Sequence, residues 1–380
     1  MHTSASPTLN TPILLLVFNR PNTTERVFEA IRRQRPRQLF VAADGPRPHV
    51  DADAERCDAA RKIATRVDWD CEVKTLFRKR NLGCRVALSS AITWFFQQVE
   101  HGIILEDDIL PAPDFFPFCQ ELLLKYQDSP SVMLISGNNF QMGKRYGETS
   151  YFFSRFAHIW GWATWRRAWA LYEPEKNAFA SLRKKRVLEK IFPHEKDRNY
   201  WSRIFEKTLH GEINSWAYIW QMSIWNQDGI AIAPNVNLAS NAGFDYDATH
   251  TSGPSKLAEL PLGSVGALVH PDKIVVAEDA DAFAQRYIFS GRLENAAALA
   301  LDVATAINED RADEGATLAT RFLTVHQDDV ALEWLRLLAW NKAGKLAEHF
   351  DIIKDFIKKY PQHEGIGRLL ASLEGKASPS

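Results

Sequence analysis

The stretch Ile103-Ile104-Leu105-Glu106-Asp107-Asp108 leads an apolar run directly into three consecutive carboxylates. Like charges placed this close repel one another, so we expect a positive group beside them. In open α/β sheets, ligands bind in the crevice beyond the carboxyl ends of the strands. The stretch therefore predicts a buried strand whose acidic end faces a binding crevice. A solvated acidic turn is the alternative interpretation.

The three acids are expected to have different roles, because adjacent side chains of a strand point to opposite faces. We expect Asp108 to bind a divalent cation directly. Asp107 would reach that ion through water or accept a hydrogen bond from a ligand hydroxyl. Mg²⁺ and Mn²⁺ prefer carboxylate and phosphate oxygens. The predicted cofactor is therefore Mn²⁺ or Mg²⁺.

Apolar runs on both sides of this stretch alternate with helical patterns. The runs are continuous, as in strands that are covered on both faces. We expect strands at residues 13–18, 39–43, 73–77, 103–105, 132–135 and 230–233. We expect helices at 51–67, 84–99 and 114–126, and an earlier one capped by Asn22 or Thr23. This alternation is typical of a parallel α/β sheet.

The chain divides into three parts by composition. Residues 1–10 form a polar leader that we expect to be disordered, and residues 11–282 form the α/β domain. Residues 283–380 contain Ala-rich amphipathic segments that predict an all-helical domain. This domain either resembles a tetratricopeptide-type (TPR-like) unit or forms a plain helical cap.

Composition excludes several classes of protein. The 380 residues carry 46 Lys and Arg against 47 Asp and Glu, so no overall charge would hold the chain on nucleic acid or an anionic membrane. No apolar run approaches the roughly 20 residues of a membrane helix. The 4 cysteines form no CxxC pair, which disfavours a zinc module and fits a reduced, cytoplasmic setting. Peripheral attachment at the inner membrane stays open.

Polar groups also follow the other expected strands. Asn19 and Arg20 come after the first strand, where they could contact a base or a phosphate. Asp44 closes the second strand and could accept a hydrogen bond from a pyrimidine ring, although a capping aspartate would look the same. Asn81 and Gly83 open a helix whose positive end favours a diphosphate. The alternative is an ordinary strand-to-helix turn for Asn19 and Arg20, and a solvated basic loop for Lys79 and Arg80 just before Asn81.

Tryptophans concentrate in the middle of the chain, since 8 of the 12 lie between residues 151 and 227. Indole faces stack on pyranose rings, which makes such a region suitable for carbohydrate. Most of these side chains are expected in the core, among them Trp165, Trp169, Trp220 and Trp225. The expected substrate-binding residues are His158, Trp160, Gly161, Trp162 and Trp216.

Taken together, these motifs resemble a bacterial, hemolytic-protein-like branch of the family 2-like glycosyltransferases. The residues that carry the resemblance are Phe18-Asn19-Arg20-Pro21, Ala42-Ala43-Asp44-Gly45-Pro46, Asn81-Leu82-Gly83-Cys84, Ile104-Leu105-Glu106-Asp107-Asp108, Trp160-Gly161-Trp162-Ala163-Thr164-Trp165 and Pro234-Asn235-Val236-Asn237-Leu238. The Glu-Asp-Asp string is similar to the metal motif of eukaryotic N-acetylglucosaminyltransferases. The likeness covers about residues 12–282.

The resemblance implies a GT-A fold, a Rossmann-like mixed sheet that binds a nucleotide-diphospho-sugar. It implies a metal-dependent, inverting transfer from a UDP- or dTDP-sugar to a bacterial glycan or lipid-linked acceptor, as in cell-surface polysaccharide biosynthesis. His250 resembles the second metal ligand, beside Asp108. Asn19, Arg20, Asp44, Asn81, Gly83, Glu106 and Asp107 would bind the donor. A sugar-nucleotide pyrophosphorylase is disfavoured, because no Gly-rich loop follows the first strand.

One position departs from the family pattern. Relatives often carry Asp in the middle of the Trp-x-Tyr step, where this chain has Ala217. That Asp is the natural general base for the acceptor hydroxyl. The base is then elsewhere, with Asp245, Glu212 and Asp107 as catalytic candidates. Alternatively, the protein is a catalytically altered sugar-nucleotide-binding scaffold that recruits a partner through its helical tail.

Overall fold

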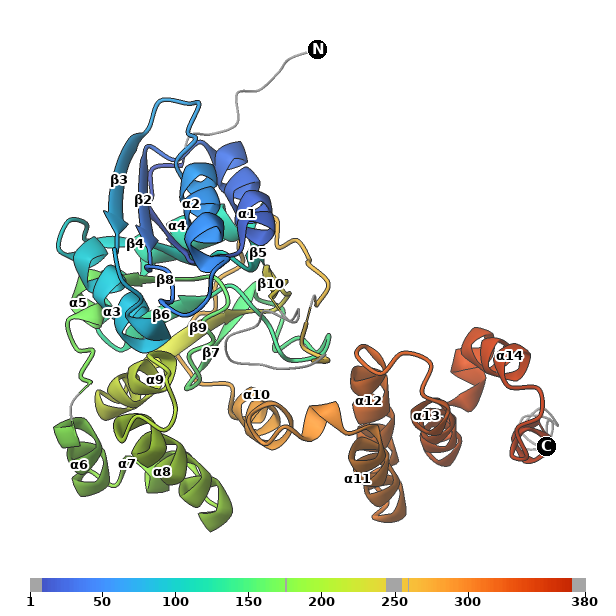
Figure 1. Ribbon diagram of the computed structural model, residues 1–380. Coiled ribbons are helices and arrows are strands. Elements are labelled where there is room, and N and C mark those ends of the chain that lie inside the picture. The colour runs from blue at the N-terminus through green and yellow to red at the C-terminus, as the bar shows by residue number, and fades with distance from the viewer. Residues whose placement is uncertain (1–8, 175, 244–254, 259, 371–380) are drawn as a thin grey trace. The chain divides into compact units, whose positions relative to one another are not determined.

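The computed structural model describes residues 9–174, 176–243, 255–258 and 260–370 (Figure 1). The chain forms two compact units. The first contains Met1–Asn139 and Arg145–Asp281, and the second contains Phe140–Lys144 and Ala282–Ser380. The second unit therefore includes a short internal segment as well as the C-terminal part of the chain.

A large β-sheet organises the first unit. Its strands are β1 (Ile13–Val17), β2 (Gln38–Ala43), β3 (Glu72–Phe77), β4 (His101–Glu106), β6 (Val132–Ser136), β7 (Tyr151–Ser154), β8 (Trp162–Trp165) and β9 (Ile230–Pro234). They lie in the order β3-β2-β1-β4-β8-β6-β9-β7. A separate two-stranded sheet pairs β5 (Ile109–Pro111) with β10 (Ala239–Asn241).

The sheet is mixed rather than parallel throughout. Strands β3, β2, β1 and β4 are parallel, as the apolar runs predict. However, β8 runs antiparallel to both β4 and β6, and β7 runs antiparallel to β9. The α/β class and the mixed sheet are confirmed, whereas the short strands β7 and β8 were not expected from the apolar runs.

Helices pack on the parallel half of the sheet. They are α1 (Pro21–Gln34), α2 (Asp53–Ala64), α3 (Gly83–Phe96) and α4 (Phe115–Lys125). Neither Asn22 nor Thr23 caps α1, contrary to the prediction. The helix starts at Pro21, whose fixed φ suits the first helical position, and Thr24 Oγ1 donates a hydrogen bond to the Arg20 carbonyl at 2.7 Å.

A second group of helices follows β8 and contains Trp169, Trp201, Trp220 and Trp225. It comprises α5 (Arg166–Trp169), α6 (Lys176–Lys184), α7 (Val187–Ile191), α8 (Glu195–Leu209) and α9 (Ala217–Asn226). The inward orientation predicted for Trp165, Trp169, Trp220 and Trp225 is confirmed, since all four are buried. The tryptophan density of this region therefore builds a packed aromatic core.

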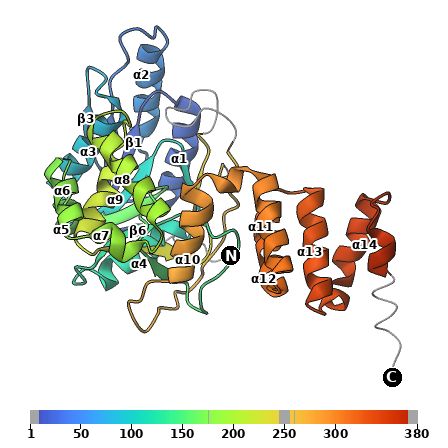
Figure 2. The same cartoon turned by 90° about the horizontal axis from the view of Figure 1, so that it is seen from below.

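The C-terminal part of the second unit, which follows α10 (Glu278–Phe283), is helical, as Figure 2 shows. A π-helical turn (Ala284–Phe289) and a 3₁₀ turn (Arg292–Glu294) lead into α11 (Ala296–Asn308), α12 (Ala312–Leu323) and α13 (Val330–Lys342). A second 3₁₀ turn (Leu346–His349) precedes α14 (Phe350–Lys359). The all-helical character predicted for this part of the chain is present in its described residues.

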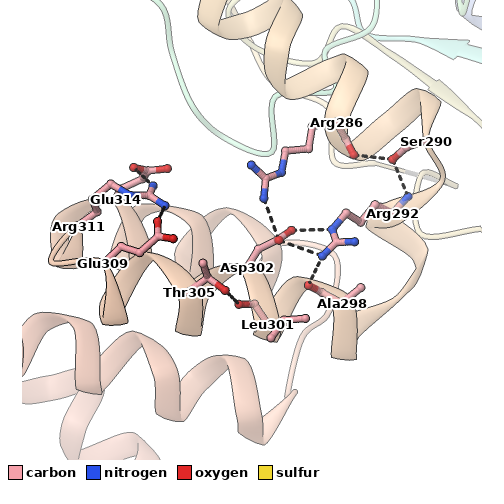
Figure 3. A network of polar contacts seen from close by, with 10 residues as sticks. All are labelled: Arg286, Ser290, Arg292, Ala298, Leu301, Asp302, Thr305, Glu309, Arg311 and Glu314. Atoms are coloured by element: carbon pink, nitrogen blue, oxygen red, sulfur yellow. Dashed lines mark hydrogen bonds and ion pairs between the residues drawn. The ribbon is translucent and has the colours of Figure 1, made fainter. Parts of the chain in front are cut away.

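A buried aspartate joins the start of this unit to α11. Asp302 accepts hydrogen bonds from Arg286 at 2.8 Å and from Arg292 at 2.6 and 2.9 Å (Figure 3). Burial raises the pKa of this carboxyl, but the two guanidinium groups outweigh that effect and lower it. The paired charges fix the two preceding turns against the helix.

Candidate functional site

The ends of four parallel strands place the predicted site residues at one edge of the sheet. The register pairs Leu16 with Glu106 and Val17 with Ala43, and it pairs Ala43 with Phe77. The segments that follow β1, β2, β3 and β4 consequently leave the sheet on the same side. Asn19, Asp44, Asn81 and Asp108 all belong to these segments.

Arg20 supplies the positive charge that the acidic strand end requires. Its Nη1 lies 2.5 Å from Oδ2 of Asp108, and the two side chains are only 16% and 15% exposed. Asp107 is held differently, because its Oδ2 accepts a hydrogen bond from the Phe18 amide at 2.8 Å. The loop after β1 is therefore fastened to the end of β4 by two neighbouring carboxylates.

The three carboxyls hold their protons more strongly than isolated ones do. Burial raises the pKa of Glu106 to about 8 and that of Asp107 to about 7, with a further contribution from the charge of Asp108. Burial also raises the pKa of Asp108, although Arg20 opposes the shift. Arg20 therefore does not offset the charge of all three carboxyls in their ionised forms, and a second cation would stabilise those forms.

The chain returns to this corner after β10. The Ala242 amide donates a hydrogen bond to the Asp108 carbonyl at 2.8 Å. Gly243 packs so closely that an added Cβ would lie 2.2 Å from Oδ2 of Asp108 and 2.8 Å from Nη1 of Arg20. The candidate residues Asp245 and His250 come next in sequence but lie outside the described residues.

The carboxylates at this corner are suitable ligands for a hard cation, but the described residues supply too few of them to complete its coordination. Within the described ranges, no group of three or more His, Cys, Asp or Glu side chains is arranged to hold a metal ion. Asp108 and Asp107 offer the oxygen ligands that Mg²⁺ and Mn²⁺ prefer. The remaining protein ligand would have to come from residues such as His250, outside the described part.

Asp44 caps the loop that leads into α3. Its two oxygens accept hydrogen bonds from the amides of Gly45, Leu82 and Gly83 and from Nδ2 of Asn81, all at 2.8–3.1 Å. Five such contacts fill the acceptor capacity of a carboxylate. The capping interpretation accounts for these contacts of Asp44, Asn81 and Gly83, and their role in donor binding stays a prediction.

Asn19 contacts a carboxylate that the sequence interpretation missed. Its Nδ2 donates to Asp53 Oδ1 at 2.7 Å, and Arg47 binds the same carboxylate with Nε at 2.6 Å and Nη2 at 2.9 Å. Arg47 is the main reason that the pKa of Asp53 is lowered to about 2. No spacing signal marks Asp53, because the three residues meet only through the fold.

The predicted sugar-binding aromatics lie mostly in the core. Trp162 and Trp216 are 1% and 2% exposed and stack on each other with ring centroids 5.5 Å apart. Their faces are therefore covered by protein. His158 is also buried, and burial lowers its pKa to about 4. Trp160 is half-buried, and its amide donates to Asn138 Oδ1 at 3.2 Å.

Gly161 has a backbone reason for being glycine. Its φ is +63°, and an added Cβ would lie 3.0 Å from the Ala239 side chain. Its carbonyl accepts a hydrogen bond from the Gly137 amide at 2.6 Å. A residue with a side chain would be strained by the φ and crowded by Ala239. Gly161 thus sets the entry into β8 beside β6.

The base candidates within the described residues differ in environment. Glu212 is exposed, and its Oε2 lies 3.8 Å from Lys207 Nζ. Ala217 is the first residue of α9, and its neighbour Trp216 stacks on the first residue of β8. Asn214, in the same loop, accepts a hydrogen bond from the Arg85 amide of α3 at 3.3 Å. Position 217 therefore lies at the start of α9, next to a loop whose residues contact α3 and β8.

Comparisons with known proteins give no assignment. No protein-family model matches the chain, and no curated protein matches it significantly. Among the described residues, no helix has both the length and the apolar character needed to cross a membrane. Function must therefore be argued from the site itself.

Proposed function

We propose that the protein is a metal-dependent glycosyltransferase with a GT-A type domain. It would transfer a sugar from a UDP- or dTDP-sugar to a bacterial glycan or a lipid-linked acceptor. The observation that carries the proposal is the acidic end of β4. Glu106 is the last residue of this central strand, and Asp107 and Asp108 follow it at the edge where α/β sheets bind ligands. The motif resemblance supplies the reaction class.

In this proposal the acidic corner holds the donor's diphosphate through a cation. Asp108 would bind Mn²⁺ or Mg²⁺ together with His250, and the bound ion would supply charge neutralisation for the leaving diphosphate. Arg20, 2.5 Å from Asp108, would exchange that carboxylate for a phosphate oxygen, since both are good partners for a guanidinium group. Glu106 and Asp107 would accept hydrogen bonds from donor hydroxyls.

Ala217 favours a second candidate, a sugar-nucleotide-binding scaffold without turnover. An alanine at the start of α9 offers no group that can remove a proton. The helical second unit would then recruit a partner, in a TPR-like manner or as a plain cap. Both candidates bind the sugar nucleotide, but only the glycosyltransferase transfers its sugar.

A donor panel tests the proposal. The full chain is incubated with UDP- and dTDP-sugars, with and without Mn²⁺, and released UDP or dTDP is measured. The transferase predicts metal-dependent release that Asp108→Asn abolishes and that Asp128→Asn, an exposed control on the α4–β6 turn, leaves unchanged. If no sugar nucleotide binds in either condition, the proposal is wrong.

Position 217 separates the two candidates. If the base has been lost, Ala217→Asp should increase turnover without tightening donor binding. If wild-type protein turns over and Ala217→Asp leaves the rate unchanged, the base lies elsewhere. Donor binding without turnover in both proteins supports the scaffold.

A further inference from the structure

A groove of about 560 Å³ lies between α13 and α14 of the helical unit. Every residue that lines it belongs to the second unit. Its apolar lining is Ile352 and Phe356, and its cations are Arg336, Lys358 and Lys359. A volume of this size accommodates several side chains of a ligand, whereas a single small ion would occupy little of it.

Arg336 is a cation without an anion in this groove. Its Nε is buried and has no hydrogen-bond partner, and the guanidinium forms no ion pair with any residue that the structure describes. Its Cζ lies 5.1 Å from the ring centroid of Trp340. Burial lowers the pKa of Arg336, and the charge of Glu333 opposes this shift only in part. A partly desolvated charge without a counterion is unfavourable, so an anion in the groove would stabilise it.

The acids of the groove do not neutralise its cations. Glu333 is 13% exposed, and its Oε1 accepts a hydrogen bond from Lys359 Nζ at 2.7 Å. Asp355 and Lys358 are both exposed, and neither forms an ion pair within the described part of the chain. A carboxylate ligand could therefore bind Arg336 and Lys358 without displacing an internal ion pair.

The lining selects for a particular kind of anion. A guanidinium group binds a carboxylate through two parallel hydrogen bonds. Ile352 and Phe356 add apolar surface beside the cations, and a bare phosphate or polyphosphate would leave that surface without a partner. A peptide that combines acidic and apolar side chains satisfies both parts of the groove.

We propose that the groove between α13 and α14 binds a peptide segment of a partner protein in which acidic side chains flank apolar ones. One carboxylate would bind Arg336 and a second would bind Lys358. The apolar side chains would lie on Ile352 and Phe356. This binding requires no sugar nucleotide, so it is independent of the transfer reaction proposed above.

Fluorescence anisotropy with the full chain tests the proposal. The probe is a labelled, end-capped peptide of sequence Glu-Glu-Leu-Phe-Glu-Glu. Arg336→Met should weaken its binding at least about tenfold, which corresponds to about 1.4 kcal/mol. Lys358→Met removes an exposed cation and should weaken binding about two- to fivefold. The control Arg311→Met removes an exposed arginine paired with Glu309 and Glu314 in the same unit (Figure 3) and should bind like wild type.

Two further peptides separate the charged from the apolar contribution. Gln-Gln-Leu-Phe-Gln-Gln and Glu-Glu-Ser-Ser-Glu-Glu should each bind at least about tenfold more weakly than the probe. If the serine peptide binds as tightly as the probe, the groove is a general anion site and the proposal is wrong. Absence of probe binding, or unchanged affinity in Arg336→Met, also overturns it.

Urea unfolding without any ligand distinguishes a binding role of Arg336 from a structural one. Methionine preserves much of the side-chain length and removes the unpaired charge, so the midpoint of Arg336→Met should be no lower than that of wild type. The probe should raise the midpoint of wild type more than that of the variant. A variant that unfolds at clearly lower urea, or fails to fold, would show that the fold depends on this guanidinium and would overturn the proposal.

Discussion

Nη1 of Arg20 lies 2.5 Å from Oδ2 of Asp108, and both side chains are largely buried. The arginine at the start of α1 is therefore the internal counterion of the acidic strand end. A divalent cation bound by Asp108 would compete with this guanidinium for the same carboxylate. The pair links the stability of the fold to the loading of the candidate site.

Replacing Arg20 by methionine should destabilise the protein and change its response to metal. Breaking a buried ion pair on one side typically costs about 3–5 kcal/mol, because the other charge stays buried without its partner. Added Mn²⁺ should recover part of that loss and should raise the unfolding free energy of Arg20→Met more than that of wild type. Urea unfolding with and without Mn²⁺ measures both effects.

The matched control is Arg66→Met, which removes an exposed pair with Glu25 and Glu29. Such surface pairs contribute about 0–1 kcal/mol, so its midpoint should hardly move and should not depend on Mn²⁺. A loss in Arg20→Met that is as small as in this control would contradict the counterion role.

Much of the fold could be predicted from the sequence because its strands are continuous apolar runs. β1, β2, β3 and β4 lie where such runs occur, and their common carboxyl edge follows from the parallel pairing. β7 and β8 were missed because Tyr151–Ser154 and Trp162–Trp165 are short, aromatic stretches within a tryptophan-rich region. Sequence spacing gave no sign that β8 inserts between β4 and β6.

The chemistry of the site was less predictable than its place. The need for a positive group beside the acids followed from charge repulsion, but its identity as Arg20 depends on the turn from β1 into α1. Likewise, a capping role for Asp44 was only one of two interpretations until Leu82 and Gly83 were placed next to it. Contacts between loops are set by tertiary packing, which one sequence does not reveal.

Asp44→Asn should lower stability irrespective of any ligand. An asparagine with its oxygen at the Oδ1 position still accepts from the Leu82 amide, but its two donors then face the Gly83 amide, which loses its acceptor. Leaving buried donors unsatisfied costs about 1–3 kcal/mol. Chemical denaturation measures the loss, and Asn81→Ala, which removes a donor at the same carboxylate, should cost less. An Asp44→Asn protein as stable as wild type would contradict the capping role.

Gly243→Ala should disturb the acidic corner by sterics alone. The new methyl group would lie 2.2 Å from Oδ2 of Asp108, so the carboxylate or the backbone must shift. Crowding of this kind typically costs about 1–3 kcal/mol. Gly367→Ala is the control, because its Cβ meets nothing within 4 Å and lies in a helix, where alanine is favourable. Thermal unfolding should separate the two variants, and equal midpoints would refute the close approach.

The buried His158 should make the protein less stable in mild acid. Burial lowers its pKa from 6.5 to about 4, so the native state disfavours the imidazolium form that the unfolded chain accepts. The buried neutral imidazole of His158 therefore contributes fully to the unfolding free energy above pH 6.5, and this contribution declines as the pH falls toward 4. A pKa shift of two to three units corresponds to a loss of about 3 kcal/mol of unfolding free energy over this pH range.

His158→Gln should remove this acid-dependent decline, whatever its effect on stability at neutral pH. Loss of the stacking against Phe156 lowers the whole curve, but a glutamine side chain cannot titrate, so the slope between pH 6.5 and 4 should become shallower. The exposed His194 gives the control His194→Gln, which should keep the wild-type slope. Unfolding free energies measured in urea at several pH values decide the matter. If the unfolding free energy of His158→Gln falls with pH as steeply as that of wild type, other groups cause the acid sensitivity, because the variant lacks only the imidazole of His158.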